Sequence, residues 1–303
     1  MEGESKPLPF CIFNFSFCIM RREWKTTRRS LVFGERTLVM GVLNVTPDSF
    51  SDGGQFSSVE RALKRAEEMI AEGTDIIDVG GESTRPGAQV VSIEEELRRV
   101  VPVIERLAKT SNIPLSIDTT KASVARAALD AGAEIINDIS GLRFDPTIAA
   151  VAAQARAGLI LMHSRGEMAT MHKLEAVSDI MLEVEAGLRS SIAEAERRGV
   201  ESERIAVDPG IGFGKSQEQN IELIAKLDEL AKTFAEFPLL VGTSRKSFIG
   251  RLLDNAPASN RLHGTMATIT AVILRGAHIV RVHDVRATVE TVRVADAIKN
   301  VTE

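Results

Sequence analysis

Short apolar runs alternate with longer amphipathic segments along the chain from Leu38 onward. Continuous apolar runs of this length, separated by helix-length segments, are typical of buried parallel strands. Eight such runs occur with no linker or low-complexity segment between them: LVMGVLN, DIIDVGG, LSID, EIIND, LILMH, RIAVDP, LLVGTSR and HIVRVHD. Eight strand–helix units predict a single closed (β/α)8 barrel of the TIM type. A doubly wound open sheet is the alternative, although no G-x-G-x-x-G sequence opens the first helix.

Helix-capping signals lie between these runs. Ser57, Ser92 and Ser216 each stand three residues before a Glu or Gln, which is the pattern of a capping box. Asp145 precedes a proline, which is tolerated at the first position of a helix. A glycine just before a strand permits the left-handed turn that ends a helix. Such glycines are Gly73, Gly132, Gly158, Gly199 and Gly276.

The composition fits this class of fold and restricts the partners. Of 303 residues, 44% are hydrophobic but only 4% aromatic, and small branched cores suit parallel sheets covered by helices. The net charge of -5 argues against a nucleic-acid partner. The two cysteines, Cys11 and Cys18, are too few for a disulfide framework and lack the partners of a zinc site. We therefore expect a cytoplasmic protein.

The first 30 residues are expected to form a flexible extension, with the barrel domain spanning residues 31–303. The apolar stretch Phe10–Met20 is too short to span a membrane. It also lacks a preceding basic region and a small-residue cleavage site, so it is a poor signal peptide. No membrane association is expected.

Every predicted strand ends in a polar residue. In a barrel of this type, the active site forms at the carboxyl ends of the strands. Each residue alone has a structural explanation, such as a helix cap, a turn or a satisfied core histidine. Eight polar ends converging on one mouth favour a functional site. These end residues are Asn44, Glu82, Asp118, Asn137 with Asp138, His163, Asp208, Ser244 with Arg245 and Lys246, and Arg281 with His283.

The types of side chain restrict the ligand. Carboxylates and amides suit a flat heterocycle with donors and acceptors, since a carboxylate accepts two parallel bonds. Lys246, Ser244, Arg281 and His283 suit an anionic group nearer the rim. No cluster has the His or Cys content of a zinc or iron site. Mg2+ shared between one protein ligand and a substrate diphosphate fits better.

Two long loops rich in Gly, Ser, Thr and Pro follow the first and second strands. They cover residues 44–54 (NVTPDSFSDGG) and 80–88 (GGESTRPGA). Loops of this kind often act as mobile lids. A merely solvated connection would explain their polarity but not the presence of Phe50, Arg85 and Pro86.

The chain resembles the dihydropteroate synthases in a series of blocks that occur in family order from Leu31 to the C-terminus. Together the blocks are very specific, whereas any single one would only be suggestive. They are MGVLNVTPDSFSDGG, DVGGESTRPGA, SIDTTK, IINDISG, DPGIGFGK, GTSRKSFIG, GTMAT and RVHDV. The stretch MHSRGEMATM (162–171) departs from the usual family pattern after its arginine.

The resemblance implies a reaction in which a pterin diphosphate and p-aminobenzoate are joined on the route to folate. It implies that Asn44 ligates Mg2+ and that Asp118, Asn137 and Asp208 hold the pterin ring. It further implies that the enzyme is a homodimer formed through barrel helices.

For the second substrate and the diphosphate, the resemblance implies several further contacts. Lys246 contacts the pterin and borders the p-aminobenzoate site. Thr84 contacts the pterin diphosphate, and Arg85 is expected among the substrate-binding residues. Phe213, Ser244 and Pro86 lie near p-aminobenzoate, and Arg281 and His283 bind the diphosphate. The residues expected to act in catalysis are Asp118, Asp208, Lys246, Arg281 and His283. Diphosphate departure before aniline attack is the expected order.

Two other functions remain open at this point. Methyltransferases that pass a methyl group from a folate to a corrinoid protein share this barrel and pterin pocket, but need no diphosphate site. A non-catalytic pterin-binding paralogue would usually lose the metal ligand or the cations. The SRKSF block, the STRPGA loop and the presence of Asn44, Lys246, Arg281 and His283 favour the synthase.

Overall fold

The computed structural model describes residues 22–45, 55–83, 91–167, 170 and 174–302. Its barrel strands are β3 (Leu38–Asn44), β4 (Ile76–Gly80), β5 (Leu115–Asp118), β6 (Ile135–Asp138), β7 (Gly158–Met162), β8 (Ile205–Asp208), β9 (Leu240–Val241) and β10 (Ile279–Val282). They are all parallel, in the order β8-β7-β6-β5-β4-β3-β10-β9. A bridge between Val207 and Leu239 joins the two edges of the sheet. The predicted (β/α)8 barrel is confirmed, and the open sheet is excluded.

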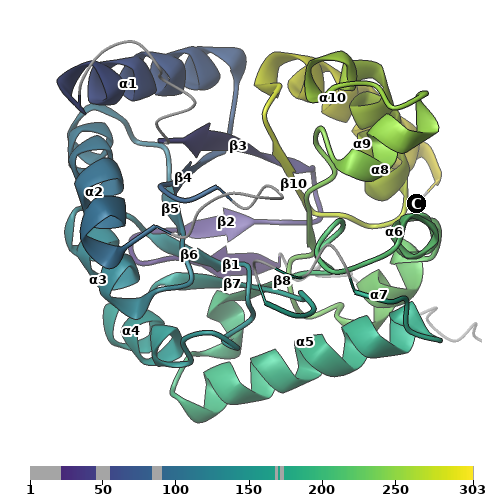
Figure 1. Cartoon of the computed structure of the whole chain (residues 1–303), viewed down its shortest axis with the longest axis horizontal. Coiled ribbons are helices and arrows are strands. Elements are labelled where there is room, and N and C mark those ends of the chain that lie inside the picture. The colour runs from purple at the N-terminus through teal and green to yellow at the C-terminus, as the bar shows by residue number, and fades with distance from the viewer. Residues whose placement is uncertain (1–21, 46–54, 84–90, 168–169, 171–173, 303) are drawn as a thin grey trace, which may run out of the picture.

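Helices surround the barrel on all sides (Figure 1). One or two helices follow each strand: α1 (Gln55–Glu72), α2 (Ile93–Thr110), α3 (Ala122–Asp130), α4 (Thr147–Ala155), α5 (Ile180–Arg197), α6 (Gln217–Ala225), α7 (Leu227–Thr233), α8 (Ser247–Leu252), α9 (Leu262–Leu274) and α10 (Val285–Thr302). Short 3-10 turns, η3 (Ser202–Arg204) and η4 (Ala258–Asn260), complete the connections. Among the described helices, none is both long and apolar enough to cross a bilayer.

The barrel strands are buried on both faces, which explains their continuous apolar runs. Side chains of a strand alternate between its two faces. In β3, Val39 and Leu43 pack in the layer between sheet and helices, whereas Leu38 and Met40 point into the barrel. The inner cluster lies where the strands begin, so it fills the amino-terminal half of the barrel. The carboxyl half is left for the polar strand ends.

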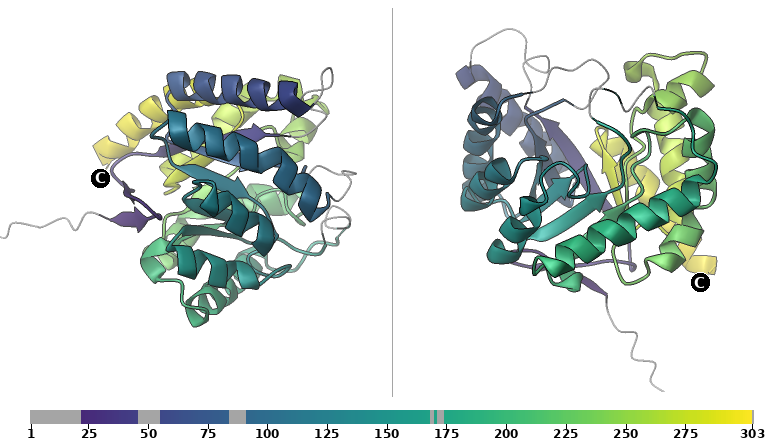
Figure 2. Two further views of the ribbon diagram at one scale, coloured as in Figure 1. Left: turned by 90° about the vertical axis from the view of Figure 1, so that its left-hand side faces the viewer. Right: turned by 60° about the horizontal axis from the view of Figure 1, so that its bottom comes forward.

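A two-stranded hairpin closes the amino-terminal end of the barrel. Strand β1 (Glu23–Lys25) pairs antiparallel with β2 (Ser30–Val32), far from the carboxyl ends of the barrel strands (Figure 2). Trp24 is completely buried in the inner cluster, and its Nε1 donates to the Arg204 carbonyl at 2.9 Å. Residues 22–30 were expected to be flexible, but in the structure they include part of a hairpin whose Trp24 packs against the barrel. Residues 1–21 lie outside the described part.

Most predicted helix signals are confirmed, with two corrections. Ser92 accepts from the Glu95 amide, and Ser216 forms a complete capping box with Gln219. Ser57 does not begin a helix, because α1 already starts at Gln55. Gly158 does not end a helix either; Arg156 takes the left-handed turn with φ of 51°.

Gly158 instead lies inside β7, where its missing side chain has a packing role. A Cβ at this position would lie 3.1 Å from the Trp24 ring. The glycine therefore makes room for the aromatic side chain that closes the barrel.

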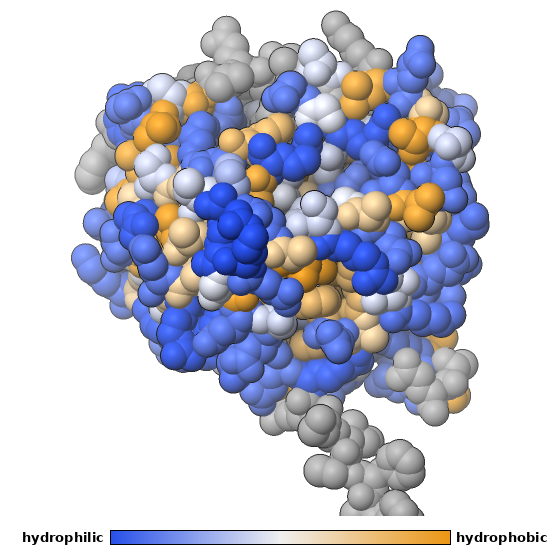
Figure 3. Space-filling view, turned by 90° about the horizontal axis from the view of Figure 1, so that it is seen from below, coloured by the Kyte–Doolittle hydropathy of each residue, from blue (hydrophilic) through white to orange (hydrophobic). Residues whose placement is uncertain are grey.

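The outer surface over α5 is mainly hydrophilic, with apolar atoms in smaller groups (Figure 3). Helix α5 buries an i, i+4 stripe that includes Ile180, Val184, Leu188 and Ile192. Its opposite side faces solvent, as expected for a helix that covers a barrel.

Candidate active site

One cavity of about 530 Å³ opens at the carboxyl ends of the strands. It collects polar residues from seven of the eight strand ends, so the predicted convergence is found. The predicted site residues that line it are Asn44, Asp118, Asn137, Asp208, Phe213, Ser244, Lys246, Arg281 and His283. Glu82 and Arg245 also line it.

The floor of the cavity is an ion-pair network centred on Arg281. Its Nε donates to Asp78 Oδ2 at 2.6 Å, and its Nη2 donates to Asp118 Oδ2 at 2.6 Å. Asn137 Nδ2 donates to the same oxygen of Asp78 at 3.0 Å. Strands β4, β5, β6 and β10 are thus joined by four side chains that face one another inside the barrel.

Sequence analysis did not identify Asp78. The residue is fully buried, and its Oδ1 has no hydrogen-bond partner among the described residues. It stands two residues before the end of β4, and only residues at the strand ends were predicted to form the site. A carboxylate in the middle of an apolar run was the available signal, because a buried charge needs a partner.

Burial raises the pKa of both predicted pterin-binding carboxylates. The pKa of Asp118 is raised to about 7, mainly by loss of solvent and against the attraction of Arg281. The pKa of Asp208 is raised to about 6 by burial, although the Gly210 amide, which donates to Oδ1 at 2.7 Å, favours ionisation. A partner that hydrogen-bonds to the ionised carboxylates would offset this cost.

Lys246 lies over an aromatic ring on the other side of the cavity. Its Nζ is 3.9 Å from the centre of the Phe213 ring, a cation–π contact. Loss of solvent, followed by the nearby charge of Arg281, lowers its pKa to about 8. A Cβ at Gly212 would lie 3.1 Å from Lys246 Cδ, so the absence of a side chain at Gly212 leaves room for the Lys246 side chain.

Lys215 holds the β8 loop that carries Phe213. Its Nζ donates to the carbonyls of Gly210 at 2.8 Å, Phe213 at 3.1 Å and His163 at 3.2 Å. Sequence analysis quoted Lys215 within a block but gave it no role. The three carbonyl groups come together only when the chain folds. The sequence therefore gives no sign that Lys215 binds them.

Ser244 and His283 fix each other at the cavity wall. Ser244 Oγ lies 3.0 Å from His283 Nδ1 and accepts from the His283 amide at 3.2 Å. Burial, with Arg281 beside it, lowers the pKa of His283 to about 3. His283 is therefore neutral in this cavity, whereas sequence analysis grouped it with the cations.

Asn44 occupies the end of β3 beside the carboxylates. A Cβ at Gly80 would lie 3.6 Å from both Asn44 Oδ1 and Asp118 Cβ, so the glycine keeps space between these side chains. Within the described residues, no group of three or more His, Cys, Asp or Glu is arranged to hold a metal ion. An amide oxygen at the edge of a cavity fits a magnesium ion that takes its other ligands from substrate and water.

Several predicted residues are placed elsewhere or cannot be placed. Thr84, Arg85 and Pro86, and the first loop after Val45, lie outside the described residues. Asp138 is buried and accepts from the Ser140 amide and hydroxyl, so it has the structural role of holding a turn.

His163 does not line this cavity. It faces a neighbouring hollow of about 460 Å³, and burial lowers its pKa to about 2. A Cβ on Gly187 of α5 would lie 2.5 Å from its ring. The ring is thus closely packed, but its Nδ1 has no hydrogen-bond partner among the described residues, so His163 is not the satisfied core histidine of the structural explanation.

Glu82 fastens both ends of the second predicted loop. Its Oε2 accepts from Lys121 Nζ at 2.6 Å, and its Oε1 accepts from the Val91 amide at 3.0 Å. Lys121 also pairs with the buried Glu96 at 2.5 Å. The two described stems of residues 84–90 are thus held together at the rim.

Comparison with known proteins identifies this arrangement. The family model "Pterin binding enzyme" matches residues 40–283. The dihydropteroate synthase of Synechocystis is 52% identical over 266 residues, which cover 88% of this chain and 91% of that protein. That of Bacillus subtilis is 47% identical over 275 residues, covering 91% of this chain and 93% of that protein.

Solved structures agree with the sequence matches. A Clostridium difficile dihydropteroate synthase, solved in the presence of pteroic acid, matches with a TM-score of 0.82 and 47% identity over 88% of this chain and 98% of that chain. The Xanthomonas albilineans enzyme with 4-aminobenzoic acid matches with a TM-score of 0.85 and 42% identity over 92% of this chain and 98% of that chain. The chain belongs to the dihydropteroate synthase family of pterin-binding transferases.

Proposed function

We propose that this chain condenses (7,8-dihydropterin-6-yl)methyl diphosphate with p-aminobenzoate, giving 7,8-dihydropteroate and diphosphate for folate synthesis. The observation that carries the proposal is that one cavity combines buried carboxylates and an amide with cations and a hydroxyl. The first set suits the donor-rich edge of a pterin, and the second suits anions.

The pterin ring is assigned to the floor formed by Asp118, Asn137 and Asp208. Asp208 is 5% exposed and Asn137 is 2% exposed, so a bound ring would be shielded from water. Ionised carboxylates there would accept hydrogen bonds from the amino and ring N–H groups of the pterin. Arg281 pairs with Asp78 and Asp118, and its charge favours the ionised form of Asp118.

The second substrate is assigned to the wall made by Phe213, Ser244 and Lys246. The aromatic ring of p-aminobenzoate would pack on apolar side chains here, next to the methylene carbon of the pterin. The diphosphate is assigned to the neighbourhood of Arg281 and His283. A neutral His283 would contribute there as a hydrogen-bond donor instead of a cation, since its pKa is lowered to about 3 by burial.

Asn44 is the residue that would hold Mg2+ together with the diphosphate oxygens. When bound, Mg2+ would neutralise negative charge that grows on the departing diphosphate. The donor set supports this assignment, because a hard cation prefers oxygen ligands and keeps several waters.

The chemistry requires the C–O bond to the diphosphate to break and a C–N bond to the aniline nitrogen to form. We propose that departure comes first and that Asp118 and Asp208 stabilise the resulting cation electrostatically. The aniline nitrogen attacks through its lone pair and afterwards loses one proton. Its low basicity means that no strong general base is needed.

We further propose that the enzyme is a cytoplasmic homodimer. Helix α10 exposes Val294, Ile298 and Val301, spaced by four and three residues, with exposed fractions of 62%, 50% and 86%. An apolar stripe of this kind on a charged surface is typical of an interface. The cytoplasmic assignment rests on the low cysteine count.

The test of the reaction is turnover of the purified protein with the pterin diphosphate, p-aminobenzoate and Mg2+. Dihydropteroate and diphosphate are followed together, beside Asp208→Asn and the exposed control Asp130→Asn. We expect product from the wild type and the control, a steep loss in Asp208→Asn, and no product after chelation. Bound pterin without turnover, or turnover that requires a corrinoid protein, would contradict the proposal.

A further inference from the structure

Arg245 adopts a backbone conformation that residues with a Cβ rarely use. Its φ is +58°, in the left-handed region, and it stands between two residues assigned to substrate binding, Ser244 and Lys246. Such a turn persists only when the surroundings hold it. Two contacts of its backbone contribute to this: the Arg245 amide donates to Thr265 Oγ1 at 3.1 Å, and its carbonyl accepts from Arg261 Nη1 at 2.9 Å.

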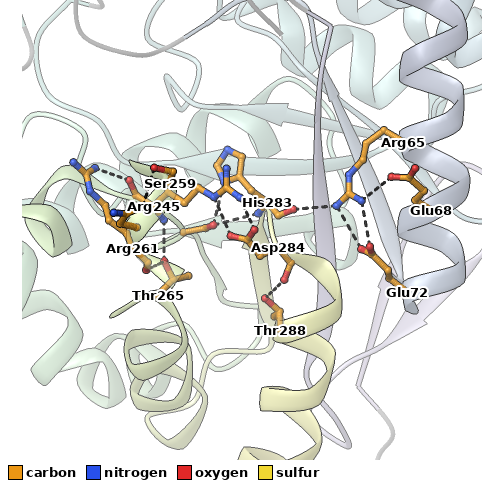
Figure 4. Close-up of polar contacts among 12 residues, drawn as sticks. Arg65, Glu68, Glu72, Arg245, Ser259, Arg261, Thr265, His283, Asp284 and Thr288 are labelled. Carbon is orange, nitrogen blue, oxygen red and sulfur yellow. Dashed lines mark hydrogen bonds and ion pairs between the residues drawn. The ribbon is translucent and has the colours of Figure 1, made fainter. Parts of the chain in front are cut away.

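The side chain of Arg245 forms a two-bond ion pair with Asp284. Nε donates to Oδ2 at 2.9 Å, and Nη2 donates to Oδ1. This pair joins the loop after β9 to the loop after β10, as Figure 4 shows. Planar two-bond pairs of this kind fix the orientation of both partners.

Asp284 is itself held in place by its neighbours. It follows His283 directly, and the His283 carbonyl accepts from Arg65 Nη2 of α1 at 3.3 Å. Thr288 Oγ1 donates to the Asp284 carbonyl at 2.8 Å, at the start of α10. The backbone that carries the Asp284 carboxylate is therefore held on both sides, and Arg245 is oriented against it (Figure 4).

We propose that Arg245 and Asp284 are positioning residues of the p-aminobenzoate site. Their ion pair holds the left-handed turn that places Ser244 beside His283 and Lys246 over Phe213. Neither residue needs to touch the reacting atoms for this role. The inference rests on the proposed function, because Ser244 and Lys246 are assigned to the second substrate there.

The position of the pair predicts which substrate is affected. The pterin floor is built on β5, β6 and β8, and none of its three side chains bonds to Arg245 or Asp284 among the described contacts. A displaced turn moves Ser244 and Lys246 but leaves Asp118, Asn137 and Asp208 in place. The pterin would thus lose only its expected contact with Lys246, whereas p-aminobenzoate would lose two of its wall residues. Loss of the pair should therefore weaken the second substrate more than the first.

The test compares Asp284→Asn, Arg245→Gly and Arg245→Lys with the wild-type enzyme. Glycine tolerates the positive φ but cannot form the ion pair with Asp284. Lysine keeps the positive charge but cannot make the two parallel hydrogen bonds of a guanidinium group. Because small misplacements of binding groups are costly, we expect the KM for p-aminobenzoate to rise about tenfold or more in Asp284→Asn and Arg245→Gly. In Arg245→Lys the rise should be smaller. Pterin affinity, measured by calorimetry, should fall by a smaller factor than the KM for p-aminobenzoate rises in each of the three variants, because Asp118, Asn137 and Asp208 stay in place.

The control is Arg36→Gln, which removes a two-bond ion pair with Asp75 at the opposite end of the barrel. It should leave the KM of both substrates unchanged. An unchanged KM for p-aminobenzoate in Asp284→Asn would overturn the inference, as would a parallel loss of affinity for both substrates. Absence of product with the wild-type enzyme would instead contradict the proposed function.

Discussion

At the scale of single residues, Asp208 combines a functional charge with a cost in stability. Its pKa is raised to about 6 by burial, so the folded state binds more protons than the unfolded chain between about pH 4 and pH 6. Stability contributed by the protonated form is therefore lost as the pH rises through this window. The carboxylate is kept ionised at neutral pH although the fold alone would be more stable without its charge.

This conflict gives a prediction for Asp208→Asn. Asparagine keeps an oxygen for the Gly210 amide but carries no charge. We expect the melting temperature at pH 8 to rise by about 2–4 °C. Pterin affinity should fall about 10- to 100-fold, because hydrogen bonds to charged groups contribute about 1.5–3 kcal/mol. Calorimetry and thermal denaturation on one sample measure both; a lower melting temperature would contradict the account.

At the scale of elements, the β1–β2 hairpin stabilises the barrel without entering the active site. Replacing the fully buried Trp24 with alanine would leave a cavity at the amino-terminal end of the barrel. We expect Trp24→Ala to lower the free energy of unfolding by about 3–5 kcal/mol. Both KM values should be unchanged at a temperature where the variant is folded, since the hairpin lies at the end opposite the mouth. Urea denaturation measures the free energy of unfolding. Trp24→Phe should lower it by less than Trp24→Ala does.

The sequence was sufficient to predict the strands, because each lies in a mainly apolar run and a polar residue stands at its end or shortly after it. It also placed nine of the predicted site residues at one mouth. It could not find the roles of Asp78 or of the Arg245–Asp284 pair, because their partners are distant in sequence. It could not find the role of Lys215 either, because carbonyl groups of the backbone carry no sequence signal. It misassigned Trp24 because the hairpin is only three residues per strand, too short to show a period.

At the scale of the whole molecule, the apolar stripe on α10 predicts the oligomeric state. Val294→Glu should convert a dimer into monomers in sedimentation experiments, because a charge would be buried without a partner. Leu182→Glu is the matched control on the hydrophilic face over α5, since Leu182 is 64% exposed and Val294 is 62% exposed. If the wild type sediments as a monomer, or if both variants behave alike, the interface does not include α10.

The position of the hairpin also determines how the enzyme can be attached to a support. Arg22, the first described residue, lies at the barrel end that Trp24 closes, while the substrates are proposed to enter at the other end. A linker joined ahead of the hairpin would therefore hold the protein on a chip or resin with its mouth towards the solution. Immobilised in that direction, it would remain open to substrates and inhibitors in flow.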